Sequence, residues 1–326
     1  MPTIPAFAKI NLGLKVLYRR PDQFHEIATL FQTISLADEL EVEAAASGDT
    51  SIETTSDTEI PGDNLATRAA RQWLDSTSKS ARVRIHIKKR IPMGGGLGGG
   101  STDAAAVLLA LPALLGVETS LEELLPIAAK LGSDLPFFLM GGTAEASGRG
   151  EILTEVPDLE TIHGVLIAPG LHISTPDAYR RLNRPFATEL TPARQVEIIE
   201  RFRALVRSVH ENHPPAVWAS DCENDFEPVA FEQHAVLDSL LGRIRATGAR
   251  PANMSGSGST LFGLYETAEA AAAAEAQLRV ELSGHATVIR VEKFHTISRR
   301  QYKRAWHTAL ASFTDGASWP PRSLIV

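Results

Sequence analysis

The chain has 326 residues, of which 44% are hydrophobic, and a net charge of −7. The length favours about two domains with cores of their own, and the single cysteine, Cys222, excludes a disulfide framework and a cysteine-based zinc site. The negative charge argues against broad nucleic-acid binding, no run approaches the roughly 18 apolar residues of a membrane span, and the first residues lack a secretory pattern. We therefore expect a cytoplasmic protein that binds neither nucleic acid nor membrane.

The first predicted element is a strand over residues 6–16, "AFAKINLGLKV". Successive side chains of a strand alternate between its faces. One face then carries Ala8, Ile10, Leu12, Leu14 and Val16, and the other carries Phe7, Lys9, Asn11, Gly13 and Lys15. The alternation predicts that Lys9 and Asn11 point together, away from the core face.

A helix is predicted for "LATRAARQWL", with Asn64 before it as a suitable N-cap. The following run, "RVRIHIKKR" at residues 82–90, alternates as a strand and leads directly into a glycine loop. From Gly94 to Gly100 every residue but Leu97 is glycine. The predicted order is therefore helix, strand and glycine loop.

Three kinds of glycine loop are weighed. Gly94, Gly96 and Gly99 satisfy the dinucleotide fingerprint, but about 90 residues precede it, whereas that fingerprint belongs to the first βαβ unit. A P-loop requires a lysine where this chain has Ser101. A tight turn without a ligand does not need six entropically costly glycines. A phosphate loop of another kind remains.

The loop opens a predicted helix. We expect Ser101 as its N-cap and Asp103 in its first turn, where the helix dipole favours an anion. The run "AAAVLLAL" at residues 104–111 is apolar on every side, which predicts a buried helix. The unpaired N–H groups of its first turn suit an anion such as phosphate.

Asp134 lies in the apolar stretch "LGSDLPFFL", and Pro136 is expected to hold Leu135 in extended geometry. A turn or cap aspartate and a functional carboxylate both stay open from these residues alone. Strand-like "HGVLIAPG" then begins a new unit near residue 163. A helix is predicted for residues 191–209, with Thr191 as its N-cap. Its buried face should comprise Val196, Ile199, Phe202, Leu205, Val206 and Val209.

The segment "PMGGGLGGGSTDAA", which begins at Pro92, resembles the phosphate loop of the GHMP kinases. The resemblance spans roughly residues 4–295 and includes "AKINLGL", "FHEIATLFQ", "GDNLATRAA", "GSDLPFFLMGGTAEASGRGE", "ENDFE" and "NMSGSGSTLFGLY". It implies a two-domain α+β fold: a ribosomal protein S5 domain 2-like domain at 1–160, a ferredoxin-like domain at 161–298 and a tail at 299–326. The substrates are expected in the cleft between the domains.

The resemblance also implies ATP-dependent phosphorylation with Mg²⁺, whose ligands stay unassigned. Lys9, otherwise readable as a solvated surface charge, and Asp134 match the family's catalytic pair. The expected ATP-binding residues are Pro92, Met93, Gly94, Gly95, Gly96, Leu97, Gly98, Gly99, Gly100, Ser101, Thr102 and Asn64. Asn64 also keeps its role as an N-cap.

Within the family, the segments are most similar to the members that phosphorylate the 2-hydroxyl of 4-(cytidine 5'-diphospho)-2-C-methyl-D-erythritol (CDP-methylerythritol) in non-mevalonate isoprenoid biosynthesis. The resemblance implies that Asn11, Phe24, His25, Thr175 and Tyr179 bind this acceptor. Phe24 replaces a common tyrosine and keeps its ring face. The alternatives are a kinase for another small alcohol, such as mevalonate or homoserine, and a nucleotide-binding protein without catalysis. The resemblance is compatible with a monomer or a homodimer.

Overall fold

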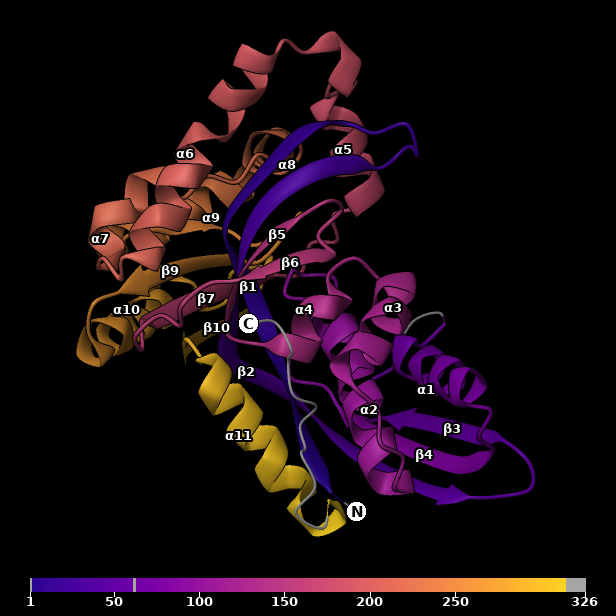
Figure 1. The fold of residues 1–326 in the computed structure, drawn as a ribbon. Helices are drawn as coiled ribbons and strands as arrows, with labels where there is room; N and C mark the ends of the chain where they lie inside the picture. The colour runs from indigo at the N-terminus through magenta and orange to yellow at the C-terminus, as the bar shows by residue number, and fades with distance from the viewer. Residues whose placement is uncertain (1, 61–62, 315–326) are drawn as a thin grey trace.

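A computed structural model describes residues 2–60 and 63–314 (Figure 1). Its first sheet has the strand order β3-β4-β2-β5-β6, and β1 also pairs with β2. The strands are β1 (Thr3–Arg19), β2 (His25–Ala46), β3 (Ser51–Ser56), β4 (Ala81–Lys88), β5 (Thr143–Ser147) and β6 (Ile152–Glu155). Only β3 and β4 pair in parallel among these strands.

Strands β1 and β2 form one long antiparallel hairpin, which runs from the N-terminus to the upper half of the molecule beside α5 and α8 (Figure 1). The predicted strand at 6–16 is confirmed but extends over 17 residues. Its register shifts between Phe7 and Lys9 and again between Asn11 and Gly13. Such bulges re-aim side chains next to functional sites. Both faces are buried in the middle of β1, so Lys9 and Asn11 lie within the protein.

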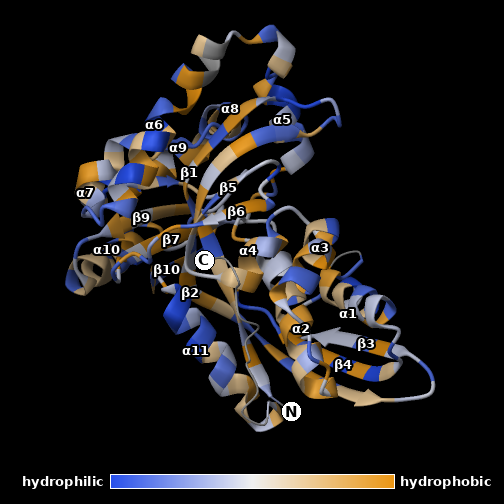
Figure 2. Ribbon diagram, viewed as in Figure 1, coloured by the Kyte–Doolittle hydropathy of each residue, from blue (hydrophilic) through white to orange (hydrophobic). Residues whose placement is uncertain are grey.

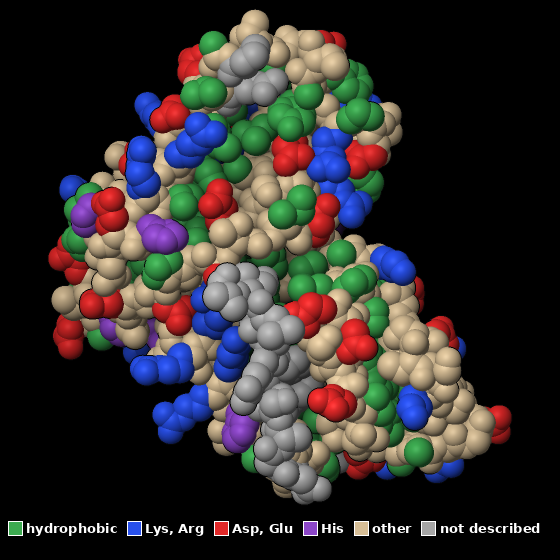
Figure 3. Space-filling view, viewed as in Figure 1, with side chains coloured by type: hydrophobic (Ala, Val, Ile, Leu, Met, Phe, Trp, Pro, Cys, Tyr) green, Lys and Arg blue, Asp and Glu red, His purple; other side chains and the backbone are tan. Residues whose placement is uncertain are grey.

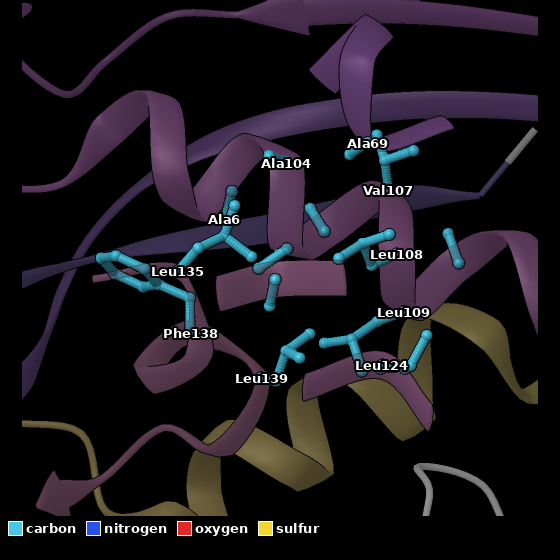
Figure 4. Close-up of a cluster of buried hydrophobic side chains, with 14 of the residues drawn as sticks. Ala6, Ala69, Ala104, Val107, Leu108, Leu109, Leu124, Leu135, Phe138 and Leu139 are labelled. Atoms are coloured by element: carbon cyan, nitrogen blue, oxygen red, sulfur yellow. The ribbon is translucent and has the colours of Figure 1, made fainter. Parts of the chain in front are cut away.

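Helices α1 (Leu65–Thr77) and α2 (Gly99–Leu115) pack against the first sheet, and α3 (Leu121–Leu131) and α4 (Leu135–Met140) pack on these helices. Residues 104–111 of α2 are all buried, as predicted, and side chains from α1, α3 and α4 surround them (Figure 4). The hydropathy colouring shows α2 as a predominantly apolar helix (Figure 2). A helix that is apolar all round needs partners on every side, and these elements provide them.

The start of α2 differs from the prediction. The helix begins at Gly99, and Gly98 in left-handed geometry (φ 74°) takes the N-cap position, so Ser101 lies inside the helix. Asp103 is consequently the fifth helical residue, beyond the first turn. Glycine reaches this backbone geometry without the penalty that a Cβ imposes, which explains why the helix starts before the serine.

The second sheet is antiparallel with the order β10-β7-β9-β8. Its strands are β7 (His163–Pro169), β8 (Ala252–Met254), β9 (Leu261–Tyr265) and β10 (Val288–His295). Its helices are α5 (Thr175–Leu182), α6 (Pro192–His210), α7 (Pro215–Trp218), α8 (Glu227–Gln233), α9 (Ala235–Ala246) and α10 (Ala268–Glu281). Helices thus separate β7 from β8 and β9 from β10, which is the ferredoxin-like βαββαβ order. Single 3₁₀ turns occur at Ala187–Glu189, Ala219–Asp221 and Ala311–Phe313.

Helix α6 begins at Pro192 as predicted, and Phe202, Leu205 and Val209 are buried. Val196 was expected on the same face but is exposed, because the first turns of α6 extend beyond the apolar cluster that covers the rest. Cys222 is buried as a core residue, and burial raises the pKa of its thiol.

The last described helix, α11 (Arg299–Leu310), leaves the second sheet and returns to pack on β1. Tyr302, Trp306 and Leu310 belong to the core of the first sheet. Residues 315–326 of the predicted tail lie outside the described residues.

Acidic and basic side chains are mixed over the face shown in Figure 3. Among the described helices, none is long and apolar enough to cross a bilayer.

Candidate active site

The predicted pair Lys9 and Asp134 comes together where β1 passes the N-terminus of α4. The Lys9 Nζ lies 3.3 Å from the Asp134 Oδ2 and donates a hydrogen bond to the Asn11 Oδ1 at 2.6 Å. The Lys9 side chain is 3% exposed and that of Asp134 is 35% exposed. The ammonium is therefore enclosed by protein, whereas the carboxylate opens toward a cavity.

Asn11 is oriented by its own partners. Its Nδ2 donates to the Thr29 Oγ1 at 2.8 Å, and the Thr29 hydroxyl donates to the Gly13 carbonyl at 2.7 Å. The Asn11 amide oxygen is consequently turned toward Lys9. The Lys9 ammonium also lies over the ring of Phe31, 5.2 Å from its centroid.

Burial is the main influence on Lys9 and lowers its pKa, while the charge of Asp134 and its hydrogen bond act in the opposite direction. Desolvation disfavours the charged form of a lysine, and a nearby carboxylate favours it. Asp134 thereby helps to keep the buried ammonium protonated.

Asp134 precedes α4 and makes no side-chain cap hydrogen bond, so its carboxylate is not used as a helix cap. The expectation that Leu135 is extended is wrong, because Leu135 begins the helix and Pro136 follows it. A proline in the first turn loses no helical hydrogen bond, since those N–H groups have no partner within the helix.

A cavity of about 460 Å³ adjoins the pair. The glycine loop contributes Gly94, Gly96 and Gly98 to its lining, and a second glycine-rich loop contributes residues 256–258. Of the other predicted ATP-binding residues, none lines this cavity, and Asn64 caps α1 by accepting a hydrogen bond from the Ala66 amide at 2.8 Å. The N-cap role of Asn64 is confirmed, whereas its contact with adenine stays a prediction.

Close contacts within the protein leave no space for a side chain at two positions of the glycine loop. A Cβ on Gly96 would overlap the Ser255 carbonyl, and one on Gly98 would overlap the Phe138 ring. A Cβ on Gly99 would meet the Cγ2 of Ile91 at 3.1 Å. At Gly96 the loop is thus pressed against the second glycine-rich loop and at Gly98 against α4, and a Cβ does not fit at these two positions.

A buried cluster of charged side chains, Lys89, Asp38 and Asp103, lies next to the glycine loop. The Lys89 Nζ lies 2.5 Å from the Asp38 Oδ2 and 2.8 Å from the Asp103 Oδ2. The other Asp38 oxygen accepts hydrogen bonds from the Arg90 and Ile91 amides. Burial raises the pKa of Asp103 to about 7, although the Lys89 charge opposes the shift. Asp103 therefore serves the Lys89 cluster rather than the helix dipole.

Four of the five predicted acceptor residues line a second cavity of about 560 Å³, whereas the fifth, Asn11, lines the first. The two cavities adjoin at Ser133, Arg149, Thr175, Pro176 and Tyr179. Here the His25 ring stacks on Tyr179 with centroids 4.8 Å apart. Phe24 is half exposed, and the Arg149 guanidinium lies over its ring at 4.6 Å. The structure thus gathers Phe24, His25, Thr175 and Tyr179 around this cavity, with the rings of His25 and Tyr179 stacked on each other.

Sequence reasoning missed Arg149, which lines both cavities, and Ser255, whose Oγ donates to the Gly96 carbonyl at 3.0 Å. Arg149 lies in the quoted motif "GSDLPFFLMGGTAEASGRGE", and Ser255 lies in "NMSGSGSTLFGLY". Both motifs belong to the family resemblance, but within them only Asp134 was assigned a role.

Family models agree with this architecture. The model for the GHMP kinases N terminal domain matches residues 64–142, and that for the GHMP kinases C terminal domain matches residues 191–282. The chain carries a glycine loop, a lysine–aspartate pair and two adjoining cavities in this fold, and it belongs to the GHMP kinases.

The chain is 44% identical to the 4-diphosphocytidyl-2-C-methyl-D-erythritol kinase of Solibacter usitatus over 98% of this chain and 96% of that relative. It is 42% identical to the enzyme of the same name from Thermus thermophilus over 83% and 90% of the two chains. A crystal structure of 4-(cytidine 5'-diphospho)-2C-methyl-D-erythritol kinase matches with a TM-score of 0.71 and 37% identity, covering 90% of this chain and 98% of that one. A homoserine kinase from Cytophaga hutchinsonii, 19% identical with a TM-score of 0.70, shares the fold and covers 91% and 95% of the two chains.

Proposed function

We propose that this protein transfers the γ-phosphoryl group of ATP to the 2-hydroxyl of CDP-methylerythritol. We further propose that its two domains comprise residues 1–160 and 161–298. The observation that carries the proposal is the adjoining pair of cavities: one lies against the Lys9–Asp134 pair and the glycine loop, and the other lies against stacked aromatic rings. The names of the relatives support this acceptor.

The chemistry follows from the two side chains. Asp134 accepts or polarises the proton of the acceptor hydroxyl, which makes the oxygen more nucleophilic. Lys9 keeps its positive charge close to that carboxylate and offsets charge on the phosphoryl oxygens as they transfer. Phosphoryl transfer depends mostly on positioning and electrostatic stabilisation, so an enclosed ammonium held by Asn11 and Asp134 suits the task.

The acceptor base would be held in the second cavity. Tyr179 offers a ring face for stacking, and its pKa is raised by burial and by the charge of Asp134, so its hydroxyl stays protonated. Burial lowers the pKa of His25, and the charges of Arg19 and Arg184 lower it further. A neutral His25 has one ring nitrogen that donates and one that accepts, which suits the edge of a cytosine.

Magnesium is part of the proposal as a companion of ATP. Within residues 2–60 and 63–314, no group of three or more His, Cys, Asp or Glu side chains is arranged to hold a metal ion. This fits Mg²⁺, which is commonly held by substrate phosphates and few protein oxygens. Ser133 and Ser257 are among the residues that line the first cavity, and their hydroxyl groups would supply oxygens of this kind. When bound, the ion neutralises charge on the phosphates.

The test measures the release of ADP from ATP in the presence of Mg²⁺. CDP-methylerythritol, mevalonate and homoserine are offered as acceptors in separate assays. We expect turnover with the cytidyl acceptor alone. Turnover with mevalonate or homoserine alone would reject this acceptor and leave the chain a kinase for another alcohol. ATP binding without turnover of any acceptor would favour a nucleotide-binding protein.

A further inference from the structure

Helix α4 carries Asp134 immediately before its first residue, yet it has only six residues, from Leu135 to Met140. A helix of this length is not stable by itself and takes its orientation from packing. All six residues are buried, and Phe138 fills the space beside Gly98 of the glycine loop. Whatever fixes α4 therefore fixes both Asp134 and one wall of the ATP loop.

The C-terminal end of α4 is held by the last described helix. The Tyr302 hydroxyl of α11 donates a hydrogen bond to the Phe138 carbonyl. Carbonyls in the last turn of a helix have no partner within it, so this hydroxyl satisfies one of them. The Tyr302 ring also covers Gly141, where a Cβ would overlap it.

The start of α11 holds the segment that follows α4. The Arg299 Nη2 donates to the Thr143 carbonyl at 2.5 Å, and the Arg299 amide donates to the Asp158 Oδ1 at 2.7 Å. On the opposite side, the Thr33 amide of β2 donates to the Gly142 carbonyl at 2.9 Å. Residues 141–143 are thus fixed between β2 and α11.

These contacts form a continuous path from α11 to the reacting groups. Tyr302 contacts Phe138, the Phe138 ring packs beside Gly98, and a Cβ on Gly98 would also lie 3.5 Å from the Lys9 Cγ. Leu135 and Phe138 of α4 belong to the same buried cluster as Ala6 of β1 (Figure 4). The path uses a helix to which the sequence assigned no role.

We propose that Tyr302 is a positioning residue for phosphoryl transfer, because α11 holds α4 and thereby aligns Asp134 with Lys9 and the glycine loop. The inference rests on the proposed kinase function and adds a residue outside both cavities. Misplacement of reacting groups by about 1 Å costs up to about a hundredfold in rate, so loss of a single support should have a measurable effect.

The test is Tyr302→Phe in the full chain, which removes the hydroxyl and keeps the buried ring. We expect kcat to fall about fivefold, while the KM for ATP and for the acceptor changes less than twofold. Tyr265→Phe is the matched control, because its hydroxyl hydrogen-bonds with Thr247 at 2.6 Å in the second sheet. Tyr265→Phe also removes one hydrogen-bonded tyrosine hydroxyl, but at a position away from α4. Its kcat should stay within twofold of the wild-type value.

A double-mutant cycle separates positioning from general stability. In an Asp134→Asn background, adding Tyr302→Phe should lower kcat by less than twofold, because the group that Tyr302 aligns is already inactive. An unchanged kcat in Tyr302→Phe, an equal loss in Tyr265→Phe, or the same fivefold loss with Asp134→Asn would each overturn the proposal. If the wild-type protein phosphorylates a different alcohol, the proposed acceptor fails, and the cycle is run with that alcohol.

Discussion

The Asp134 carboxylate lies 3.3 Å from the Lys9 ammonium and opens to the cavity without serving as a helix cap. We expect Asp134→Asn to lower kcat by at least about a hundredfold, because proton transfer and positioning of this kind typically contribute 10²–10⁴-fold. ATP affinity, measured by equilibrium binding, should change little, since the glycine loop is retained. Near-normal turnover would remove Asp134 from the mechanism.

Lys9 and Asp134 share one environment, so their effects should not be independent. Lys9→Met is expected to slow turnover strongly, because it removes the charge that faces Asp134 and the phosphoryl group. The double substitution should cost less than the product of the single effects, which steady-state kcat values can decide. Strictly multiplicative losses would indicate that the two groups act separately.

His25 provides a pH-dependent observable in the second cavity. Burial is the main cause of its lowered pKa, and the cations Arg19 and Arg184 add to it. Removing a cation favours the protonated imidazole, so Arg184→Gln should raise the His25 pKa, as followed by NMR of the ring. Asp225, the ion-pair partner of Arg184, keeps its second partner Lys15 at 3.1 Å in this variant.

Arg180→Gln is the control for that titration. Arg180 lines the same cavity but pairs with Asp177, and it is not among the groups that lower the His25 pKa. The His25 titration should therefore stay in place. A His25 pKa unaffected by Arg184→Gln would mean that the Arg184 charge does not contribute to it, and that burial and Arg19 set it.

At the scale of elements, Gly98 and Gly100 of the glycine loop differ in what a Cβ at each position would contact. Gly98 has a φ of 74° and faces the Phe138 ring, so Gly98→Ala combines left-handed strain with overpacking and should destabilise by about 2–5 kcal/mol. Gly100 lies inside α2, where a Cβ would make only an ordinary contact with Leu65 at 3.6 Å. Gly100→Ala should instead stabilise by about 0.5–1 kcal/mol.

Urea unfolding measures both changes, and ATP affinity adds a second readout. Gly98→Ala should also weaken ATP binding, because it displaces the loop from α4. Equal stability of the two variants would contradict the assigned packing.

Much of each element could be predicted because its cause is local. Alternation placed Lys9 and Asn11 on one side of β1, and an all-apolar run predicted the burial of α2. The start of α2 was missed by three residues, from Ser101 to Gly98 as the N-cap, because Gly98 supplies a backbone conformation that side-chain capping rules do not consider. The approach of Ser255 to Gly96 depends on residues 159 positions apart, and periodicity within a segment carries no information about it.

At the scale of the molecule, the family resemblance implied two α+β halves, and the two sheets agree with it. The return of α11 to the first sheet was not foreseen, since an amphipathic helix after the last strand can cover either sheet. Its apolar residues Tyr302, Trp306 and Leu310 indicate burial but do not name the partner.

The hairpin of β1 and β2 is a single ribbon that carries His25 near its turn and Lys9 in its middle. Strands advance about 3.3 Å per residue, so the ribbon sets the distance between His25 and Lys9. Under the proposed function, this is the distance between the base of the acceptor and its reacting hydroxyl. Deleting two residues from each strand between these points would keep every side chain on its face and shorten the reach by about 7 Å. Such a variant should lose turnover of a diphosphate-linked acceptor and gain relative preference for a monophosphate-linked one, as competition between the two acceptors would reveal.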